Sequence, residues 1–229
     1  MINSKIILEH QIEEERKFKK SIPSDDYNTQ MTQQTPMLSF SGKFQTVCVS
    51  LIDIVHSTKI TSMLSELELS QFYSIFLNTM AAIIKKHDGI IVKNIGDALL
   101  YYFPVTDSVE MCIDQSLQCN IAILRERKNL NKVLSDANLP TISYRLSSDF
   151  GRVIVATSMI SSIDDIFGSV VNMCAKINSM GKLNRMIIGN DLYIYAKSLQ
   201  QYKFVESDSK RLDDFKTCYP IYLVLSPFD

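Results

Sequence analysis

Two aspartates stand beside stretches of sequence that are otherwise apolar. Asp53 lies near the end of the apolar run at residues 44–54, and Asp97 follows Gly96 between the apolar segments 90–95 and 98–103. Carboxylates that lie close together repel each other unless a cation separates them, and hard divalent cations commonly bind carboxylate and triphosphate oxygens together. The pair therefore predicts a site for two divalent cations. Each aspartate taken alone fits a turn or helix-cap position equally well.

The residues around each aspartate could hold a phosphate chain. After Asp53 the sequence continues Ile54-Val55-His56-Ser57-Thr58, and backbone N–H groups at a junction between a strand and a helix can face phosphates. Lys93 stands four residues before Asp97, and Gly96 gives the backbone the freedom that a tight turn requires. Taken alone, Lys93 would more often be a solvated strand residue.

The first half of the chain predicts the elements that position these residues. The run at 44–54 is rich in Val, Leu and Ile, which is typical of a central strand buried on both faces. Ser65 and Glu68 form a capping box before apolar residues at helical spacing, and Asp88-Gly89 ends that helix. Strands at 90–95 and 98–103 then form a hairpin.

The second half completes an α+β fold. Asp107 and Glu110 predict a second capping pattern before a helix that reaches at least Arg127. The order β-α-β-β-α-β is the ferredoxin-like core, an antiparallel sheet with helices on one face, which a C-terminal αβαβ portion extends. The further predicted elements are strands at 142–147 and 153–157, a helix at 170–180, a strand at 185–188, a short helix after Asp191 and a strand at 219–225.

Composition sets the domain organisation. A chain of 229 residues with 46% hydrophobic residues predicts one folded domain at 41–229, preceded at 1–40 by a short helix near 6–20 and a flexible linker. The helix could pair with a partner or remain a solvated tail. A net charge of -1 provides no overall field that would attract nucleic acid or an anionic membrane.

The cysteines and the apolar runs indicate the compartment. The five cysteines form no CxxC pair and are odd in number, which is typical of reduced thiols. No run approaches the roughly 20 apolar residues of a membrane span. We therefore expect a cytoplasmic protein without a membrane span.

Three stretches resemble the motifs of one enzyme family. Residues 47–58, with Leu51-Ile52-Asp53-Ile54 at their centre, resemble the first metal-binding motif of class III adenylate and guanylate cyclases. Residues 87–98, which end in Lys93-Asn94-Ile95-Gly96-Asp97-Ala98, resemble the hairpin motif, and residues 165–176 resemble the third. The motifs occur in the family's order, and the resemblance covers roughly residues 44–225.

This resemblance implies a reaction and a set of roles. The family forms a 3′,5′-cyclic nucleotide for second-messenger signalling, by attack of the ribose 3′-hydroxyl on the α-phosphate with loss of pyrophosphate. Two Mg²⁺ or Mn²⁺ ions assist, and a homodimer builds each site from the metal ligands of one subunit and the base and ribose contacts of the other. The roles carried over are Asp53, Ile54 and Asp97 for the metals, Ser57 and Thr58 for the substrate, Lys93 and Asp165 for the purine, Asn172 for the ribose and Lys176 for the transition state.

Base choice and rate follow from these residues. A lysine can donate to the adenine ring nitrogen while a carboxylate accepts from its exocyclic amine, so Lys93 with Asp165 favours ATP, and GTP is the alternative. The family usually has arginine at the position of Lys176, and lysine lacks its planar fork, which predicts a slow enzyme. The lysine that binds the triphosphate in relatives could correspond to Lys210, Arg211 or Lys216.

Two other classes of function remain open on the sequence. One is a cyclase-like regulatory module that binds a nucleotide or only dimerises, which the loss of the arginine would favour and the presence of both aspartates disfavours. The other is a palm-type fold that joins or polymerises nucleotides on two aspartates. The third motif disfavours that reading.

Overall fold

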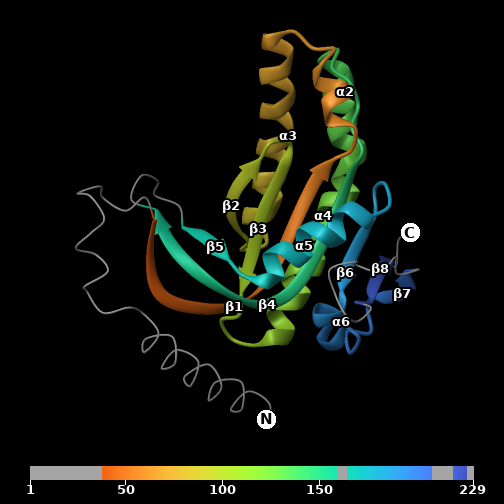
Figure 1. The fold of residues 1–229 in the computed structure, drawn as a ribbon. Coiled ribbons are helices and arrows are strands. Elements are labelled where there is room, and N and C mark those ends of the chain that lie inside the picture. The colour runs from red at the N-terminus through yellow and green to blue at the C-terminus, as the bar shows by residue number, and fades with distance from the viewer. Residues whose placement is uncertain (1–37, 159–163, 208–218, 226–229) are drawn as a thin grey trace, which may run out of the picture.

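The computed structural model describes residues 38–158, 164–207 and 219–225. They form a sheet in the order β2-β3-β1-β4-β6-β8-β7, with β5 paired to β4 (Figure 1). The strands are β1 (Leu38–Ile54), β2 (Ile90–Ile95), β3 (Ala98–Pro104), β4 (Tyr144–Ser158), β5 (Asp165–Phe167), β6 (Met186–Gly189), β7 (Lys203–Ser207) and β8 (Ile221–Leu225). The helices are α2 (Ser57–Thr61), α3 (Glu66–Lys86), α4 (Val109–Asp136), α5 (Ser169–Met180) and α6 (Asn190–Ala196).

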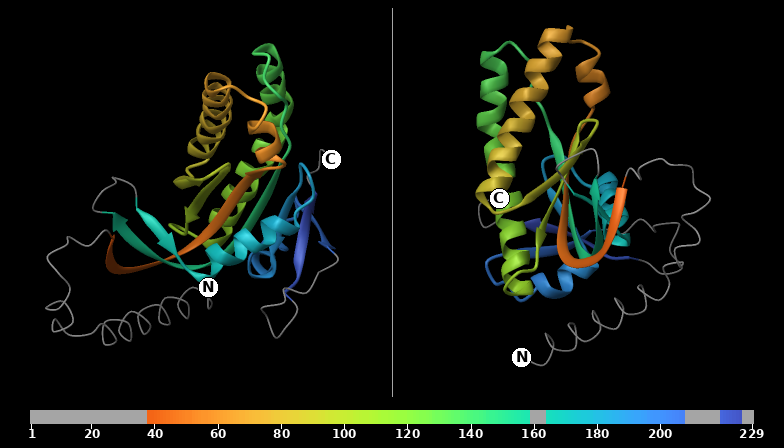
Figure 2. Two further views of the ribbon diagram at one scale, coloured as in Figure 1. Left: turned by 45° about the horizontal axis from the view of Figure 1, so that its top comes forward. Right: turned by 90° about the vertical axis from the view of Figure 1, so that its left-hand side faces the viewer.

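Strand β1 lies in the middle of the sheet and is buried on both faces, as predicted. Cys48 and Ile52 face the core that α3 and α4 cover, while Val49 and Leu51 belong to the cluster on the face of α5. Side chains alternate along a strand, so Asp53 continues the row of Val49 and Leu51. Helices α3 and α4 pack side by side on one face of the sheet (Figure 2).

Helix α3 begins as the sequence predicts. The Glu68 N–H donates to Ser65 Oγ, and the Glu68 carboxylate accepts from the Ser65 N–H at 2.9 Å, which completes the capping box. Its side chains Phe72, Phe76 and Met80 recur every fourth residue and pack in the core under β1 and β3. Among the described helices, α3 alone has the length and composition that would suffice for a membrane span.

The hairpin of β2 and β3 also forms as predicted, with Ile95 paired to Ala98. Gly96 adopts a φ of 63°, the left-handed region that glycine enters at little cost. Helix α3 ends at Lys86, and two residues later Asp88 also has a positive φ, at 60°. The Gly89 N–H donates to the Ile84 carbonyl at 2.9 Å. This Schellman-type end turns the chain from α3 into β2.

Strand β4 corrects the prediction of separate strands at 142–147 and 153–157, because it runs without a break from Tyr144 to Ser158. Its middle residues are polar yet buried, which hid the strand in the sequence. Each has a partner from a distant element: Ser147 donates to the Cys174 carbonyl, and Ser148 bonds Ser50 at 2.7 Å. Together with β1 it extends into a long curved arm that β5 borders (Figure 1).

Smaller differences concern the helix cap and the sheet. The N-cap of α4 is Ser108 and not Asp107: Ser108 has an extended backbone, and its Oγ accepts from the Met111 N–H at 3.1 Å. The sheet is antiparallel except for β4 and β6, which run parallel because a crossover through α5 joins them. Strand β1 starts at Leu38, before the predicted residue 44, while β5, β7 and α2 were not predicted. The expected N-terminal helix at 6–20 lies outside the described residues.

The cysteines agree with the expected reduced state where they are described. Cys48, Cys112, Cys119 and Cys174 are buried and free. Burial raises the pKa of the Cys112 thiol to about 11 and that of Cys119 to about 12. These thiols therefore act as apolar core side chains. Cys218 lies outside the described residues.

Asp149 of β4 is a buried carboxylate that joins three elements. Its Oδ1 accepts from the N–H groups of Phe150 at 2.9 Å and Leu192 of α6 at 3.3 Å, and its Oδ2 accepts from the Tyr219 hydroxyl at 2.8 Å. A Cβ at Gly189 would lie 2.5 Å from the carboxyl group, so only glycine fits there. Burial raises the pKa of Asp149 to about 7, and the charge of Asp191 adds to the effect.

The buried carboxyl predicts that stability falls as pH rises from about 4 to 7. In this range the folded chain keeps the Asp149 proton and the unfolded chain releases it, so ionisation costs the fold roughly 4 kcal/mol above pH 7. Asp149→Asn removes that titration, and we expect a flatter dependence in urea unfolding at pH 5 and pH 8. Asp107→Asn, which changes an exposed aspartate, should retain the wild-type slope. An unchanged slope in Asp149→Asn would contradict the assignment.

Candidate active site

The two predicted metal-binding aspartates lie at neighbouring strand ends. Asp53, near the end of β1, pairs with Ala98 of β3, and Asp97 immediately precedes Ala98 in the hairpin turn. Asp97 also lies near Tyr73 of α3, where burial and then the charge of this carboxylate raise the pKa of the tyrosine. The fold thus places both carboxylates at one end of the sheet.

Arg145 of β4 neutralises this end of the sheet. It pairs with Asp53 in the β1–β4 register, and its Nη2 donates to Asp53 Oδ2 at 2.6 Å. Its Nη1 donates to the Ser179 carbonyl near the end of α5 at 3.2 Å. The sequence analysis did not identify Arg145, because its partner lies 92 residues away and nothing local marks it.

The donor set at this end suits a hard divalent cation. Asp53 and Asp97 supply carboxylate oxygens, and the predicted third ligand, Ile54, would contribute its backbone carbonyl at the last position of β1. Oxygen donors of this kind match Mg²⁺ or Mn²⁺. Within the described ranges no group of three or more His, Cys, Asp or Glu side chains gathers. Further ligands would therefore come from a nucleotide and from water.

The structure brings Lys93 and Asp165 together, as the prediction of a shared base site requires. Lys93 Nζ lies 2.5 Å from Asp165 Oδ2, and the two residues are 72 positions apart, on β2 and β5. The other oxygen, Asp165 Oδ1, accepts from the Ile166 N–H at 2.9 Å. The lysine side chain is 44% exposed and the aspartate 20% exposed. A hydrogen-bond donor and an acceptor thus stand side by side at the surface.

The remaining predicted residues lie on two helices. Asn172 and Lys176 are one turn apart on α5, with Asn172 exposed and Lys176 half-buried. Ser57 and Thr58 open the short helix α2 directly after β1, behind His56, whose φ is 60°. The first N–H groups of a helix lack partners within it. Lys210, Arg211 and Lys216 lie outside the described residues.

Within one chain these groups form two separate half-sites. Asp165, which contacts Lys93, lies four positions before the start of α5. Arg145, the partner of Asp53, instead contacts the last turn of α5. Twelve helical residues span about 18 Å. Lys93 lies on β2 and Asp97 lies beyond the end of that strand, in the hairpin turn, four positions further along the chain.

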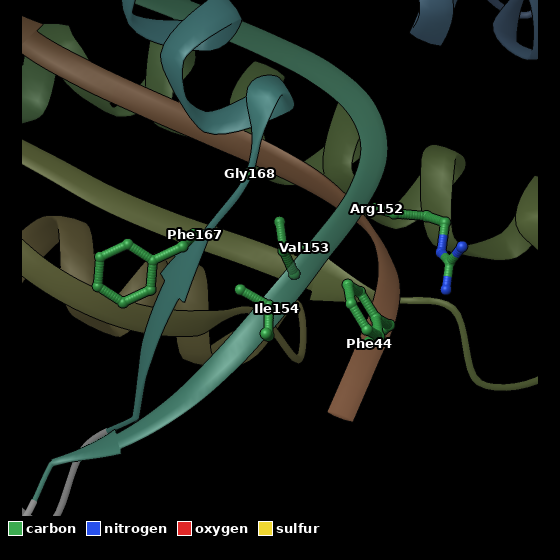
Figure 3. A pocket seen from close by; sticks show the side chains of 6 residues that line it. All are labelled: Phe44, Arg152, Val153, Ile154, Phe167 and Gly168. Atoms are coloured by element: carbon green, nitrogen blue, oxygen red, sulfur yellow. The ribbon is translucent and has the colours of Figure 1, made fainter. Parts of the chain in front are cut away.

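A surface depression lies elsewhere, on the arm formed by β1, β4 and β5. It has a volume of about 450 Å³ and is lined by Phe44, Arg152, Val153, Ile154, Phe167 and Gly168 (Figure 3). The Arg152 guanidinium lies 4.9 Å from the centre of the Phe44 ring. Phe167 is partly exposed and contacts Phe40, with ring centroids 5.5 Å apart. None of the predicted site residues lines this depression.

A family model described as the adenylate and guanylate cyclase catalytic domain matches residues 40–223. The chain belongs to this family. It is thus a class III nucleotidyl cyclase domain, and the matched range contains every predicted site residue. That coverage agrees with the three motifs recognised in the sequence.

Curated relatives of this cyclase domain carry different activities in their names. A cytidylate cyclase of Staphylococcus aureus is 20% identical over 186 residues, which cover 78% of this chain and 44% of the relative. An adenylate cyclase of Streptomyces coelicolor is 24% identical over 142 residues, which cover 62% of this chain and 32% of the relative. The chain therefore spans less than half the length of these relatives.

Solved structures share the fold of this cyclase domain. The adenylyl cyclase CyaB from P. aeruginosa matches with a TM-score of 0.74 at 20% identity, over 80% of this chain and 95% of that one. The guanylate cyclase domain of RhGC from Catenaria anguillulae, solved in complex with GTP, matches with a TM-score of 0.71 at 21% identity, over 80% and 98%. The α+β fold predicted from the sequence is confirmed.

Proposed function

We propose that this domain converts ATP, and GTP less readily, into the 3′,5′-cyclic nucleotide and pyrophosphate, as a homodimer with two divalent cations. The observation that supports this best is the contact between Lys93 and Asp165, which joins β2 to β5 in the donor and acceptor arrangement that adenine requires. The product would serve as a second messenger, and the compartment we propose is the cytoplasm. The names of the relatives divide between cytidine and adenine nucleotides, so the base has to be judged from the site itself.

The separation of the half-sites supports a dimer. In cyclisation the reacting α-phosphate and the base are attached to the same ribose, so the metal ligands and the base contacts must lie close together. Within one chain they lie near opposite ends of α5, whose twelve residues span about 18 Å. A second copy that places its Lys93 and Asp165 against Asp53 and Asp97 would remove this distance. The exposed aromatic residues Phe40 and Phe167 of the arm offer a surface for that contact.

Each residue then has a defined task. Asp53 and Asp97 would hold the cations, which when bound lower the pKa of the 3′-hydroxyl and offset negative charge on the phosphates. Asn172 would orient the ribose, and Lys176, one turn further on α5, would stabilise charge on the α-phosphate. The 3′-oxygen loses its proton to solvent and bonds to the α-phosphorus, while the bond to the β-phosphate oxygen breaks and pyrophosphate leaves. The α2 amides at Ser57 and Thr58 would face the phosphate chain.

The first test is cyclic nucleotide formation. We expect cyclic AMP from ATP in Mn²⁺ or Mg²⁺, quantified by mass spectrometry. Asp53→Asn and Asp97→Asn should lower the rate by at least about a hundredfold, because each removes a charged metal ligand. Equal product from these variants and the wild type would refute the metal assignment.

The composite site gives this test a sharp control. Asp53→Asn and Asn172→Ala homodimers should each be nearly inactive, because each lacks one half of both sites. Mixing the two should restore part of the activity, since a heterodimer contains one site with both halves intact. A site contained within one chain would give no recovery on mixing.

The ion pair of Arg145 with Asp53 predicts that the arginine and a divalent cation compete for the Asp53 carboxylate. The Arg145 guanidinium forms an ion pair with Asp53, so a divalent cation that binds Asp53 must displace the guanidinium. The displaced guanidinium could then bind the triphosphate. Arg145→Met should therefore tighten binding of Mn²⁺ alone by about fivefold, the worth of a partly exposed ion pair, and weaken nucleotide binding. Electron paramagnetic resonance of free Mn²⁺ measures the first effect. Arg125→Met, which changes an exposed arginine of α4, should leave both affinities unchanged, and the same result for Arg145→Met would contradict the competition.

The lysine at position 176 predicts that replacing it with arginine will increase the rate of cyclisation. A lysine keeps the positive charge but contacts one oxygen, whereas arginine offers a planar fork that matches a phosphoryl group. We expect Lys176→Arg to raise kcat at least about tenfold with little change in KM, because the contact acts in the transition state. Lys182→Arg, at an exposed position after α5, is the matched control. An unchanged kcat in Lys176→Arg would remove Lys176 from the catalytic step.

The second candidate function is a nucleotide-binding regulatory domain, which the lysine at position 176 favours. Calorimetry separates the two functions. Tight binding of ATP in Mn²⁺ without cyclic product, by protein shown to be dimeric, would support the regulatory domain.

A further inference from the structure

The contact between Lys93 and Asp165 selects a hydrogen-bonding pattern and not one particular base. Lys93 Nζ is a donor, and Asp165 Oδ2 beside it is an acceptor. A matching base must present a ring nitrogen that accepts, next to an exocyclic amine that donates. Adenine presents this edge through N1 and N6, and cytosine presents it through N3 and N4. Guanine and uracil present a protonated ring nitrogen beside an oxo group, which is the opposite polarity.

Lys93 and Asp165 cannot exchange their roles as hydrogen-bond donor and acceptor. Asp165 Oδ1 is already held by the Ile166 N–H, so the carboxylate cannot rotate without losing that bond. Its strand β5 is fixed to β4 by the pairing of Ala156 with Asp165. Neither charged side chain can change from donor to acceptor as an amide can. A base of the wrong polarity would therefore leave both Lys93 and Asp165 without a hydrogen bond to the base.

Size must separate adenine from cytosine, and the same face of the sheet carries a bulky side chain. Leu100 of β3 pairs with Lys93, and Tyr102 is the next residue of β3 on that face. Tyr102 is 5% exposed and packs in one cluster with Ile166, the neighbour of Asp165. The charge of Asp164 also reaches it, since burial and then this carboxylate raise the pKa of its hydroxyl. Tyr102 therefore lies on the same face of the sheet as Lys93 and packs beside the neighbour of Asp165, so it is the bulky side chain next to the base contacts.

We propose that CTP is a substrate of this domain alongside ATP, because the Lys93–Asp165 pair accepts bases with an amine beside an unprotonated ring nitrogen and Tyr102 leaves room for the smaller one. The proposal rests on the proposed cyclase function. The 3′-oxygen of CTP would bond to its own α-phosphorus, pyrophosphate would leave, and the hydroxyl proton would pass to solvent. The pair would discriminate against GTP and UTP alike.

The test compares four nucleotides on the full chain in Mn²⁺. We expect kcat/KM for CTP within about tenfold of that for ATP or above it. The values for GTP and UTP should be lower by about 10- to 100-fold, because these bases leave the charged Lys93 and Asp165 without hydrogen-bond partners. Asp165→Asn should lower CTP and ATP together and narrow the gap to GTP and UTP. Asp164→Asn, at the exposed neighbouring aspartate, should preserve the wild-type order. Tyr102→Leu should shift preference from CTP toward ATP, whereas Tyr102→Phe keeps the ring and should not.

Each result decides the proposal. Turnover of UTP or GTP equal to that of CTP would overturn selection by polarity, and turnover of ATP without CTP would overturn the pyrimidine substrate. Binding of the four 3′-deoxynucleoside triphosphates, which cannot cyclise, gives a readout apart from catalysis. If nothing is cyclised but the 3′-deoxy forms of CTP and ATP bind more tightly than the other two, the cyclase function fails and the base selection stands. Equal binding of all four would overturn the selection.

Discussion

The pairing of β1 with β4 places Asp53 opposite Arg145, and this contact sets the charge at that end of the sheet. A carboxylate at the end of a strand buried on both faces needs a positive partner, and Asp97 nearby increases the need. Arg145 supplies that charge, and its second bond to Ser179 ties α5 to the same corner. A cation binding here exchanges one positive charge for another, so the fold does not depend on the metal for its charge balance.

Helix α5 separates the base contacts from the metal ligands. Its start follows the strand that carries Asp165, and its end meets Arg145, so the base contacts and the metal ligands are held apart within one chain. Helix α5 packs against β1, β4 and β6, which fixes its two ends relative to the sheet. In the proposed homodimer, a substrate whose base and reacting phosphate share one ribose would contact surfaces of two chains. Oligomeric state would then control activity directly, because the two groups of residues would meet only across the dimer.

The parts predicted correctly from the sequence are those that local patterns determine. The Ser65 capping box, the continuous apolar run of β1 and the glycine before Asp97 each depend on neighbours within a few residues. Strand β4 was divided in two because its buried polar residues break the apolar pattern, and their partners Ser50, Cys174 and Tyr219 lie far away in sequence. Arg145 was missed for the same reason. The contact of Lys93 with Asp165 was reached only through the family motifs, since nothing local indicates that β5 returns beside β2.

The contrast between the two ion pairs of the site is chemical as well as geometric. Arg145 with Asp53 is an exchangeable pair, because a divalent cation and a triphosphate can replace each partner with a stronger one. Lys93 with Asp165 keeps its two functions when a base enters, since one side chain can donate to it while the other accepts from it. The first pair therefore responds to the charge of the substrate and the second to the polarity of its base. Neither pair distinguishes a large base from a small one. We propose that Tyr102 does so, since it follows Leu100, the residue paired with Lys93, on the same face of β3 and packs in one cluster with Ile166.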